Sequence, residues 1–299
     1  MHIVLVEPSR VTVKVVTSLL EARGHAVTAY SDSQAALDRV TGDETVACVI
    51  TSLETAPLSG LELCWQLRAL SGERRPLAIL VMSSDRGRRD IGEVLDCGAD
   101  DFMAKPPDPD ELYARLRTTE RVLRMQRELI EQADTDPLTR LLNRRAFNRR
   151  AREAMARAGE TGPLSAILLD IDHFKGINDQ FGHDAGDLII RAVADVLRET
   201  GGIAARIGGE EFGVCIPEST VTTAGVVAHQ IRTRCATLHR IKGKIPCPFT
   251  VSIGLSEWTR PESVDELMSR ADIALYASKR GGRDRVSVAN TGLIAECIS

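Results

Sequence analysis

Two adjacent carboxylates follow a pair of glycines in the second half of the chain. The stretch reads Gly208-Gly209-Glu210-Glu211-Phe212, with apolar strand-like runs at 203–207 and 212–216. A Gly-Gly pair between such runs predicts a tight hairpin, because glycine reaches positive φ at little cost. The tip of this hairpin would let backbone approach a phosphate. Its two acids could hold a hard cation and take a proton from a hydroxyl.

A third carboxylate, Asp170, ends a buried strand predicted at 165–171. The turn that follows it can present main-chain N–H groups to phosphates, and Lys175 adds a cation there. Glu210 and Glu211 come about forty residues later. If their strand lies beside the strand of Asp170, three carboxylates converge, which is the usual arrangement for Mg²⁺ on a triphosphate. The alternative for Asp170 is a helix N-cap.

Size and composition limit the classes of protein to consider. The chain has 299 residues, 43% of them hydrophobic, which suits two packed domains. A net charge of -4 offers no general basic field for nucleic acid. The seven cysteines form no C-x-x-C pair, so we expect reduced thiols in a cytoplasmic protein. No apolar run approaches the ~20 residues of a membrane helix, and no signal peptide is evident, so no membrane association is expected.

The elements that position these residues fall into two α/β domains. Residues 1–120 alternate strands predicted at 3–6, 27–30, 47–51, 77–82 and 101–104 with helical patterns such as 11–22 and 60–69. This alternation predicts a doubly wound parallel sheet. Residues 135–290 form the second domain, with further strands expected at 204–207, 212–216 and 249–256. Asp136-Pro137 predicts a helix start, as N-cap and first helical residue.

Between the two domains, residues 109–134 predict one long helix, because no Gly or Pro follows Pro109. Positions 112, 116, 119, 123, 126, 130 and 133 alternate steps of four and three residues and carry a mainly apolar stripe. Such a stripe is typical of a coiled coil, so we expect dimerisation through this helix. The alternative is a single helix that packs on its own domain.

Residues 1–120 resemble a response-regulator receiver domain, of flavodoxin-like fold. The resemblance rests on Val4-Leu5-Val6-Glu7, on the segment from Leu58 to Leu63, on Gly98-Ala99-Asp100-Asp101-Phe102 and on Lys105-Pro106. It places Ser52 where a receiver has its phosphoacceptor aspartate, and it leaves Glu7 alone in place of an acidic pair. Ser83 matches the hydroxyl switch position and Lys105 the phosphate-pairing lysine. A serine needs a base to attack a phosphoryl donor, and one acid binds Mg²⁺ poorly. We therefore expect a degenerate receiver that serves dimerisation or regulation without phosphorylation.

Residues 135–287 resemble the GGDEF family of diguanylate cyclases, of nucleotidyl-cyclase-like fold. Besides the glycine-acid hairpin, further motifs follow the family order. They are the segment from Asp136 to Arg145, Leu169-Asp170-Ile171-Asp172-His173-Phe174-Lys175, the segment from Ile177 to Asp187, and finally Val251–Gly254 and Ala271–Lys279. Together these motifs are far more specific than any one alone. The resemblance implies an enzyme that joins two GTP molecules into cyclic di-GMP with loss of two pyrophosphates.

The same resemblance implies roles for single residues. It assigns Asp170, the carbonyl of Ile171, Glu210 and Glu211 to Mg²⁺, with Mn²⁺ as the alternative ion. Glu210 would polarise the attacking 3′-hydroxyl, and Lys175 would help to neutralise the leaving pyrophosphate. Substrate binding falls to Phe174, Asn178, His183, Asp187, Gly208, Gly209, Lys279 and Arg283. Asn178 and Asp187 resemble guanine readers, because an amide and a carboxylate match the edge of that base. His183 is equally consistent with a structural helix residue, and Lys279 and Arg283 with a solvated basic helix end.

Each chain offers one GTP site, so two such domains must face each other, which implies a homodimer. Many family members bind the product at an R-x-x-D motif just before the glycines. Here the matching residues are Glu199-Thr200-Gly201-Gly202, so we expect no inhibitory product site and a shortened loop. The alternative function is a GTP-binding but catalytically silent signalling protein. A DNA-binding regulator would need a basic helix-turn-helix after the receiver.

Overall fold

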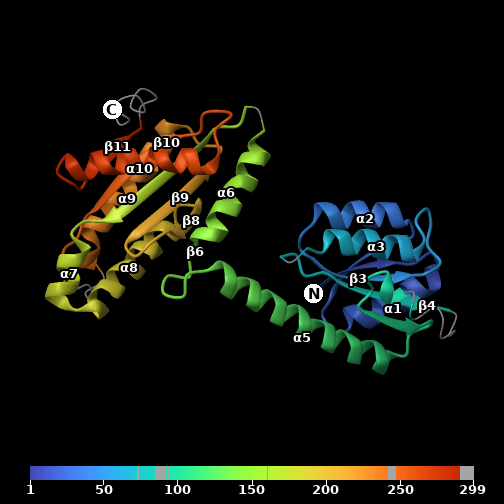
Figure 1. Ribbon diagram of the computed structural model, residues 1–299. Coiled ribbons are helices and arrows are strands. Elements are labelled where there is room, and N and C mark those ends of the chain that lie inside the picture. The colour runs from blue at the N-terminus through green and yellow to red at the C-terminus, as the bar shows by residue number, and fades with distance from the viewer. Residues whose placement is uncertain (73, 85–91, 93, 160, 242–246, 290–299) are drawn as a thin grey trace. The chain divides into compact units, whose positions relative to one another are not determined.

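The computed structural model describes residues 1–72, 74–84, 92, 94–159, 161–241 and 247–289. The chain divides into two compact units, Met1–Glu131 and Gln132–Ser299, each with its own sheet and core (Figure 1). Both units are α/β, as the sequence predicts.

The first unit is built on a five-stranded sheet in the order β2-β1-β3-β4-β5, with every pair parallel. Its strands are β1 (His2–Val6), β2 (Ala26–Tyr30), β3 (Val46–Ser52), β4 (Ala78–Ser83) and β5 (Asp101–Ala104). All seven residues of β3 are buried, which is typical of a central strand covered on both faces. The predicted doubly wound parallel sheet is confirmed.

The helices of this unit begin where short polar side chains cap them. They are α1 (Arg10–Glu21), α2 (Ser33–Gly42), α3 (Gly60–Leu70) and α5 (Pro109–Asp134). Ser9 and Asp32 accept hydrogen bonds from the first turns of α1 and α2. Ser59 and Glu62 form a capping box at α3, so two free backbone donors are satisfied at once.

Helix α5 has the predicted bounds, but its apolar stripe is used differently from a coiled-coil seam. Leu112, Leu116 and Leu123 are buried in a core cluster of the first unit itself, together with residues of β1, β3 and β4. This first part of the stripe therefore packs on its own domain, and the coiled-coil expectation is wrong for it. A different set on the same helix is exposed: Val122 (45%), Met125 (54%) and Leu129 (63%).

The second unit carries a six-stranded mixed sheet in the order β11-β10-β7-β9-β8-β6. Its strands are β6 (Leu142–Asn143), β7 (Leu164–Ile171), β8 (Ile203–Arg206), β9 (Glu211–Pro217), β10 (Val251–Glu257) and β11 (Val286–Val288). Its helices are α6 (Arg144–Ala158), α7 (Phe174–Phe181), α8 (His183–Arg198), α9 (Val221–Ile241) and α10 (Val264–Arg280). The predicted strands are found within one or two residues of their expected ends.

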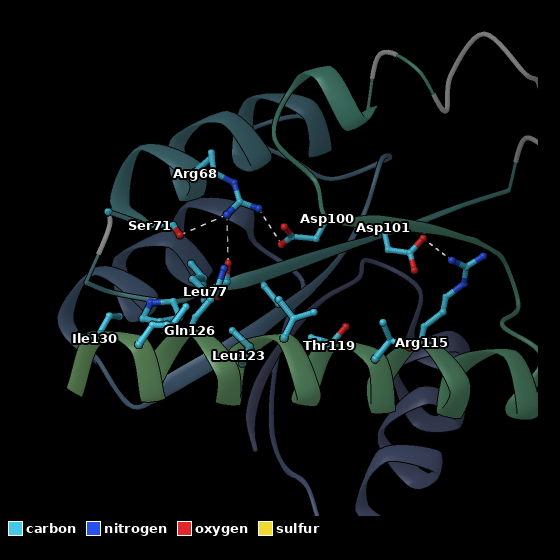
Figure 2. A pocket seen from close by; sticks show the side chains of 16 residues that line it. Arg68, Ser71, Leu77, Asp100, Asp101, Arg115, Thr119, Leu123, Gln126 and Ile130 are labelled. Atoms are coloured by element: carbon cyan, nitrogen blue, oxygen red, sulfur yellow. Dashed lines mark hydrogen bonds and ion pairs between the residues drawn. The ribbon is translucent and has the colours of Figure 1, made fainter. Parts of the chain in front are cut away.

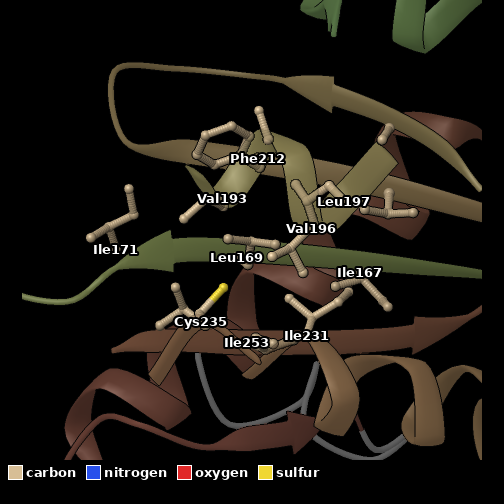
Figure 3. Close-up of a cluster of buried hydrophobic side chains, with 14 of the residues drawn as sticks. Ile167, Leu169, Ile171, Val193, Val196, Leu197, Phe212, Ile231, Cys235 and Ile253 are labelled. Atoms are coloured by element: carbon tan, nitrogen blue, oxygen red, sulfur yellow. The ribbon is translucent and has the colours of Figure 1, made fainter. Parts of the chain in front are cut away.

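Helices cover both faces of this sheet. On one face Ile167 and Leu169 of β7 and Phe212 of β9 pack against Val193 of α8 and Ile231 of α9 (Figure 3). On the other face the neighbouring residues of β7 and β9 pack against α6 and α10. Strand β7 is buried over its whole length, so the centre of the sheet is a fixed platform for whatever its end carries.

The expected helix start at Asp136 is wrong. Asp136 caps a turn instead: its carboxylate accepts from the Thr139 amide at 2.8 Å, and its carbonyl accepts from the Arg140 amide at 2.8 Å. Helix α6 begins later, at Arg144, with Asn143 as its N-cap. Asp followed by Pro suits a tight turn as well as a helix start, which explains the error.

Candidate active site

The carboxylates predicted to converge lie on neighbouring strands. Strand β7 pairs antiparallel with β9, and Asp170 stands directly opposite Glu211. The amide of Ile171 donates to the carbonyl of Glu210 at 3.3 Å. The expectation that the two strands are adjacent is therefore confirmed. Residue pairs opposite each other on two strands point to the same face, so the Asp170 and Glu211 carboxylates share one side of the sheet.

The glycine pair before these acids does form the turn of a β8–β9 hairpin, although not for the predicted reason. Neither Gly208 nor Gly209 has a φ in the left-handed region. The turn closes because the Ile207 amide donates to the Glu211 carbonyl at 2.8 Å. At Gly208 an added Cβ would lie 2.9 Å from Glu211 Oε2. Glycine at this position lets the Glu211 carboxylate lie close to the backbone of the turn.

Asp170 concentrates the electrostatics of the site. It is 7% exposed, and burial raises the pKa of its carboxyl. Lys279 Nζ, 2.8 Å from Asp170 Oδ2, acts in the opposite direction. The charges of Glu210 and Glu211 then raise the pKa of Asp170 further. One ammonium therefore faces an excess of carboxylate charge, a donor set of the hard-oxygen kind that Mg²⁺ prefers.

The three side chains do not close into a ligand cluster. In the described part of the chain, no three His, Cys, Asp or Glu side chains gather as a group that could hold a metal ion. One oxygen of the Asp170 carboxylate is instead ion-paired with Lys279. It does not cap the following helix, because the N-cap position of α7 belongs to His173. The alternative of an N-cap role for Asp170 is thus excluded.

The predicted base-reading residues lie on α7 and α8, which pack on each other. Asn178 lies on α7, and its Oδ1 atom is buried without a hydrogen-bond partner. Gly186 of α8 faces it: an added Cβ there would lie 2.0 Å from Asn178 Oδ1 and 2.9 Å from the Phe174 ring. Asp187 follows Gly186 on α8. The structure thus brings Phe174, Asn178 and the start of α8 together around one unsatisfied polar atom. Buried polar atoms normally have a hydrogen-bond partner, so Asn178 Oδ1 is a candidate acceptor for a donor from a ligand.

The predicted phosphate-binding cations come from α7 and from the end of α10, and Lys279 lies at the end of β7. Lys279 is in the last turn of α10 and contacts Asp170. Arg283 lies just after α10, with a left-handed φ of 63°. Lys175 is exposed in the first turn of α7, and His183 is the exposed first residue of α8. The substrate roles of Lys175, His183, Lys279 and Arg283 all stay predictions.

Sequence analysis missed Arg206, which holds the hairpin in place. From the end of β8 its guanidinium donates to the carbonyls of Gly208 at 3.2 Å and Gly209 at 2.7 Å. It also donates to the Asp136 carboxylate at 3.2 Å, and Asp136 lies in the turn before α6. An arginine inside an otherwise apolar strand, two residues before the glycines, was the available signal. Arg206 fixes the backbone that carries Glu210 and Glu211.

In the first unit, the residues matched to a receiver site gather at the carboxyl ends of the strands. Glu7, Ser52 and Ser83 are each at most 1% exposed. Lys105 Nζ lies 2.9 Å from Glu7 Oε2 and 2.9 Å from Glu54 Oε2, and it also donates to Ser52 Oγ. Ser52 donates to Glu54 at 2.7 Å. Partial burial acts to raise the pKa of Glu54, but hydrogen bonds from Ser52 and Lys105 hold it below its usual value.

A cavity of about 440 Å³ lies in the first unit along α5 (Figure 2). Two ion pairs border it: Arg68 with Asp100 at 2.7 Å, and Arg115 with Asp101. Its apolar lining comes largely from Leu77 and from α5, including Leu123, Leu129 and Ile130. The cavity lies at the starts of β4 and β5, whereas Ser52 and Lys105 lie at the opposite, carboxyl ends of the strands.

The fold and the site together define the class. The family model of the GGDEF domain of diguanylate cyclases matches residues 133–285, and that of the response regulator receiver domain matches residues 3–117. The chain belongs to the GGDEF family and carries a receiver domain before the GGDEF domain. Within the described residues, no helix has both the length and the apolar character required to cross a membrane.

Among its relatives is the response regulator PleD of Caulobacter vibrioides, 35% identical over 261 residues, 81% of this chain and 56% of PleD. The diguanylate cyclase DgcP of Pseudomonas aeruginosa is 40% identical over 53% of this chain and 24% of its own length. A solved structure of the coiled coil and GGDEF domain of DgcB from Caulobacter crescentus, in complex with c-di-GMP, matches with a TM-score of 0.52 and 40% identity. It covers 60% of this chain and 99% of the DgcB chain. The chain thus spans little more than half of PleD and about a quarter of DgcP.

Proposed function

We propose that this protein is a diguanylate cyclase that condenses two GTP molecules into cyclic di-GMP and releases two pyrophosphates. The observation that carries the proposal is the pairing of Asp170 with Glu211 across β7 and β9, next to Glu210 and within 2.8 Å of Lys279. This is an acid-rich strand end with a cation beside it, in a domain that matches the GGDEF model. The named activity of relatives such as DgcP supports the same reaction.

Asp170, Glu210, Glu211 and the carbonyl of Ile171 would hold Mg²⁺, or Mn²⁺ in its place. The excess of carboxylate charge around Asp170 fits such an ion. When bound, the ion supplies charge neutralisation on the triphosphate. Lys279 then becomes free to turn from Asp170 towards phosphate oxygens, with Arg283 and Lys175 as further cations.

Glu210 polarises the 3′-hydroxyl of one GTP, which attacks the α-phosphorus of the other in line with the leaving pyrophosphate. The main-chain N–H of Phe174 can donate to the phosphates, and the open backbone at Gly209 leaves room for them. Asn178 and Asp187 read guanine, since its donors satisfy carbonyl and carboxylate oxygens that adenine would leave unpaired. The unpartnered Oδ1 of Asn178 supports this role. His183 adds a further substrate contact.

The catalytic unit is a homodimer, because each domain supplies one GTP and both must react together. We place the helical contact on Val122, Met125 and Leu129 of α5 rather than on the buried leucines. These residues are exposed and alternate steps of three and four residues, as a two-helix seam requires. The match to a DgcB structure that includes a coiled coil before the GGDEF domain supports this placement.

The receiver domain works without phosphorylation of an aspartate. Ser52 stands at the end of β3, and Lys105 already has Glu7 and Glu54 as partners. The hydroxyl of Ser52 is hydrogen-bonded to Glu54 and has no acyl-phosphate chemistry of its own. The domain serves dimerisation and regulation.

Feedback by the product through an R-x-x-D site is absent. Glu199, at the arginine position, is ion-paired with Arg234 at 2.7 Å. At Gly202, the aspartate position, an added Cβ would lie 2.7 Å from Val214. The local packing leaves no room for the missing side chain.

The decisive experiment incubates the protein with GTP and Mg²⁺ and quantifies cyclic di-GMP across protein concentrations. We expect product with a steeper than linear dependence on protein concentration, as a dimeric catalytic unit gives. GTP binding without product would instead identify a silent GTP-binding signalling protein. Wild-type-like turnover without any divalent cation would remove the metal assignment.

A further inference from the structure

The segment after α10 has an unusual backbone. Gly282, Arg283 and Asp284 follow one another with φ of 112°, 63° and 43°. Left-handed conformations are rare for residues other than glycine, and two such residues in succession persist only where surrounding contacts impose them. Arg283 is one of the proposed phosphate-binding cations, so the contacts that impose this backbone also set the direction in which its side chain leaves the main chain.

One of those contacts comes from Asp172, a carboxylate to which neither the fold nor the proposed mechanism has yet given a role. It is 3% exposed. Its oxygens accept from Thr250 Oγ1 at 2.6 Å, from Ser252 Oγ at 2.6 Å and from the Asp284 amide at 3.1 Å. Thr250 and Ser252 flank the start of β10, so Asp172 joins that strand to the segment after α10.

A second contact reaches the same residue from α9. Arg232 Nη1 lies 2.8 Å from Asp284 Oδ1 and donates to the Asp284 carbonyl at 3.3 Å. Asp284 is therefore held through its amide by Asp172, and through its side chain and carbonyl by Arg232. These hydrogen bonds to charged groups are among the stronger ones in proteins, and together they restrain the strained turn.

Asp170 and Asp172 thus both contact the segment at the end of α10, each at a different group. Asp170 contacts Lys279, and Asp172, two residues further on, contacts the amide of Asp284. Asp170 is the next to last residue of β7 and Asp172 lies in the turn after it, and their contacts show that both acids reach the same basic segment. One binds its side chain and the other binds its backbone.

We propose that Asp172 is a positioning residue for nucleotide binding, which fixes the backbone of residues 282–284 so that Arg283 and Lys279 together address the β- and γ-phosphates of GTP. The inference rests on the proposed function. It goes further by separating phosphate recognition from the base recognition at Asn178 and Asp187.

The test compares the affinity of two probes for the full-length Asp172→Ala variant and the wild type. The probes are 3′-deoxy-GTP and 3′-deoxy-GMP, which lack the attacking hydroxyl and therefore bind without condensing. We expect at least about a tenfold loss for the triphosphate, because a displaced cation loses its alignment with the phosphates. The monophosphate, which lacks the β- and γ-phosphates, should keep its affinity.

Two further variants separate positioning from general damage. Asp172→Asn keeps an oxygen that can accept from the Asp284 amide, so it should recover most of the triphosphate affinity. Arg232→Ala removes the other restraint from a helix surface and should cause a smaller loss of the same selectivity. Arg234→Ala, on the same helix with its ion pair to Glu199, is the matched control and should bind both probes normally.

Wild-type triphosphate affinity in Asp172→Ala, or an equal loss for both probes, would overturn the inference. If Asp172→Ala does not fold, Arg232→Ala decides: a triphosphate-selective loss supports the inference, and unchanged binding overturns it. Because neither probe can condense, the outcome does not depend on turnover. A wild type that binds 3′-deoxy-GTP but makes no cyclic di-GMP would contradict the proposed function alone.

Discussion

Asp170 and Glu211 place two negative charges opposite each other on adjacent strands, an arrangement that is unfavourable unless a cation intervenes. Lys279 supplies one positive charge to Asp170 at 2.8 Å. Glu210 adds a third negative charge next to the pair, and the raised pKa of Asp170 reflects its burial and both neighbours. At the scale of residues, the three carboxylates therefore carry more negative charge than the one ammonium offsets, and this favours a ligand that brings positive charge.

Glu210→Gln tests the catalytic role of this excess charge. We expect cyclic di-GMP formation to fall by at least about a hundredfold, since general-base contributions are of that order. Affinity for 3′-deoxy-GTP should change little, because Lys279 and Arg283 are untouched. Asp170, Glu211 and the neutral amide oxygen of the introduced glutamine would still provide metal ligands. The measurements are product formation by chromatography and probe binding by calorimetry.

Glu199→Gln is the matched control for Glu210→Gln, because it neutralises another carboxylate of the same domain, one that is paired with Arg234 at 2.7 Å and has no part in the proposed reaction. Its turnover should equal that of the wild type. Glu210→Gln with wild-type turnover would exclude Glu210 as the group that activates the hydroxyl.

Gly186→Ala tests base recognition. Alanine favours helices over glycine by about 1 kcal/mol, but its Cβ would lie 2.0 Å from Asn178 Oδ1 and force that side chain to turn away. We expect a folded protein whose preference for GTP over ATP falls by at least about tenfold, as expected when polar contacts to the base are lost. Competition binding of the two nucleotides measures this preference.

Gly225→Ala in α9 provides the comparison for Gly186→Ala. There an added Cβ meets only Leu255 at 3.8 Å, so the melting temperature should rise slightly and nucleotide preference should stay unchanged. Unaltered GTP preference in Gly186→Ala would contradict the placement of guanine at Asn178.

Residue types and their order were enough to predict the acids of the hairpin and Asp170. The partners were not predictable, because they come from distant parts of the chain. Lys279 is 109 positions from Asp170, and Gly186 matters to Asn178 only once α7 packs on α8. Arg206 was overlooked since its partners are two backbone carbonyls, which leave no mark in the sequence, and Asp136, which lies 70 positions away.

At the scale of elements, α5 shows where a periodic pattern reaches its limit. Apolar residues at steps of three and four predict a buried helix face, but they do not specify what buries it. Leu112, Leu116 and Leu123 are covered by the sheet of their own unit. The next exposed apolar residues, Val122, Met125 and Leu129, lie on a different face.

The double variant Met125→Glu/Leu129→Glu tests the proposed seam. Two carboxylates from each chain would meet at the contact, and like charges there oppose association. We expect a monomer at micromolar concentration by light scattering, with specific activity that recovers only as the protein is concentrated. Each unit should keep its melting transition, because both side chains are exposed.

Arg127→Glu is the control for the α5 double variant. It also introduces a carboxylate on α5, but it lies about half a turn of the helix away from Met125 and Leu129. Its oligomeric state should match that of the wild type. A dimeric Met125→Glu/Leu129→Glu protein would place the contact elsewhere.

At the scale of the whole molecule, two domains share one chain, and we propose that only the GGDEF domain has a complete set of reactive groups. Parallel-sheet topology was predictable for the first domain because five apolar strands alternate with helical patterns. The closed cluster of Lys105 with Glu7, Glu54 and Ser52 was not, since Glu54 lies beyond the strand and reaches back to Ser52 and Lys105.

Treatment with acetyl phosphate or beryllofluoride tests the receiver as a whole. We expect no change in cyclase activity or in oligomer size, because in our proposal Ser52 stands where these reagents require a carboxylate. A receiver protein that has its aspartate should be treated in parallel to show that the reagents are active. Clear activation of this protein would disprove a phosphorylation-independent receiver.

The grip of the first domain on Leu112, Leu116 and Leu123 has a geometric consequence for the rest of α5. Each residue rotates an α-helix by about 100° about its axis. The packing of the three leucines on the first domain therefore determines the direction in which Met125 and Leu129 face. An insertion of one residue after Leu123 would turn them by more than a quarter circle, whereas seven residues would return them almost to their starting bearing. Insertions of seven residues would therefore lengthen this helix while keeping Met125 and Leu129 on nearly the same side of it.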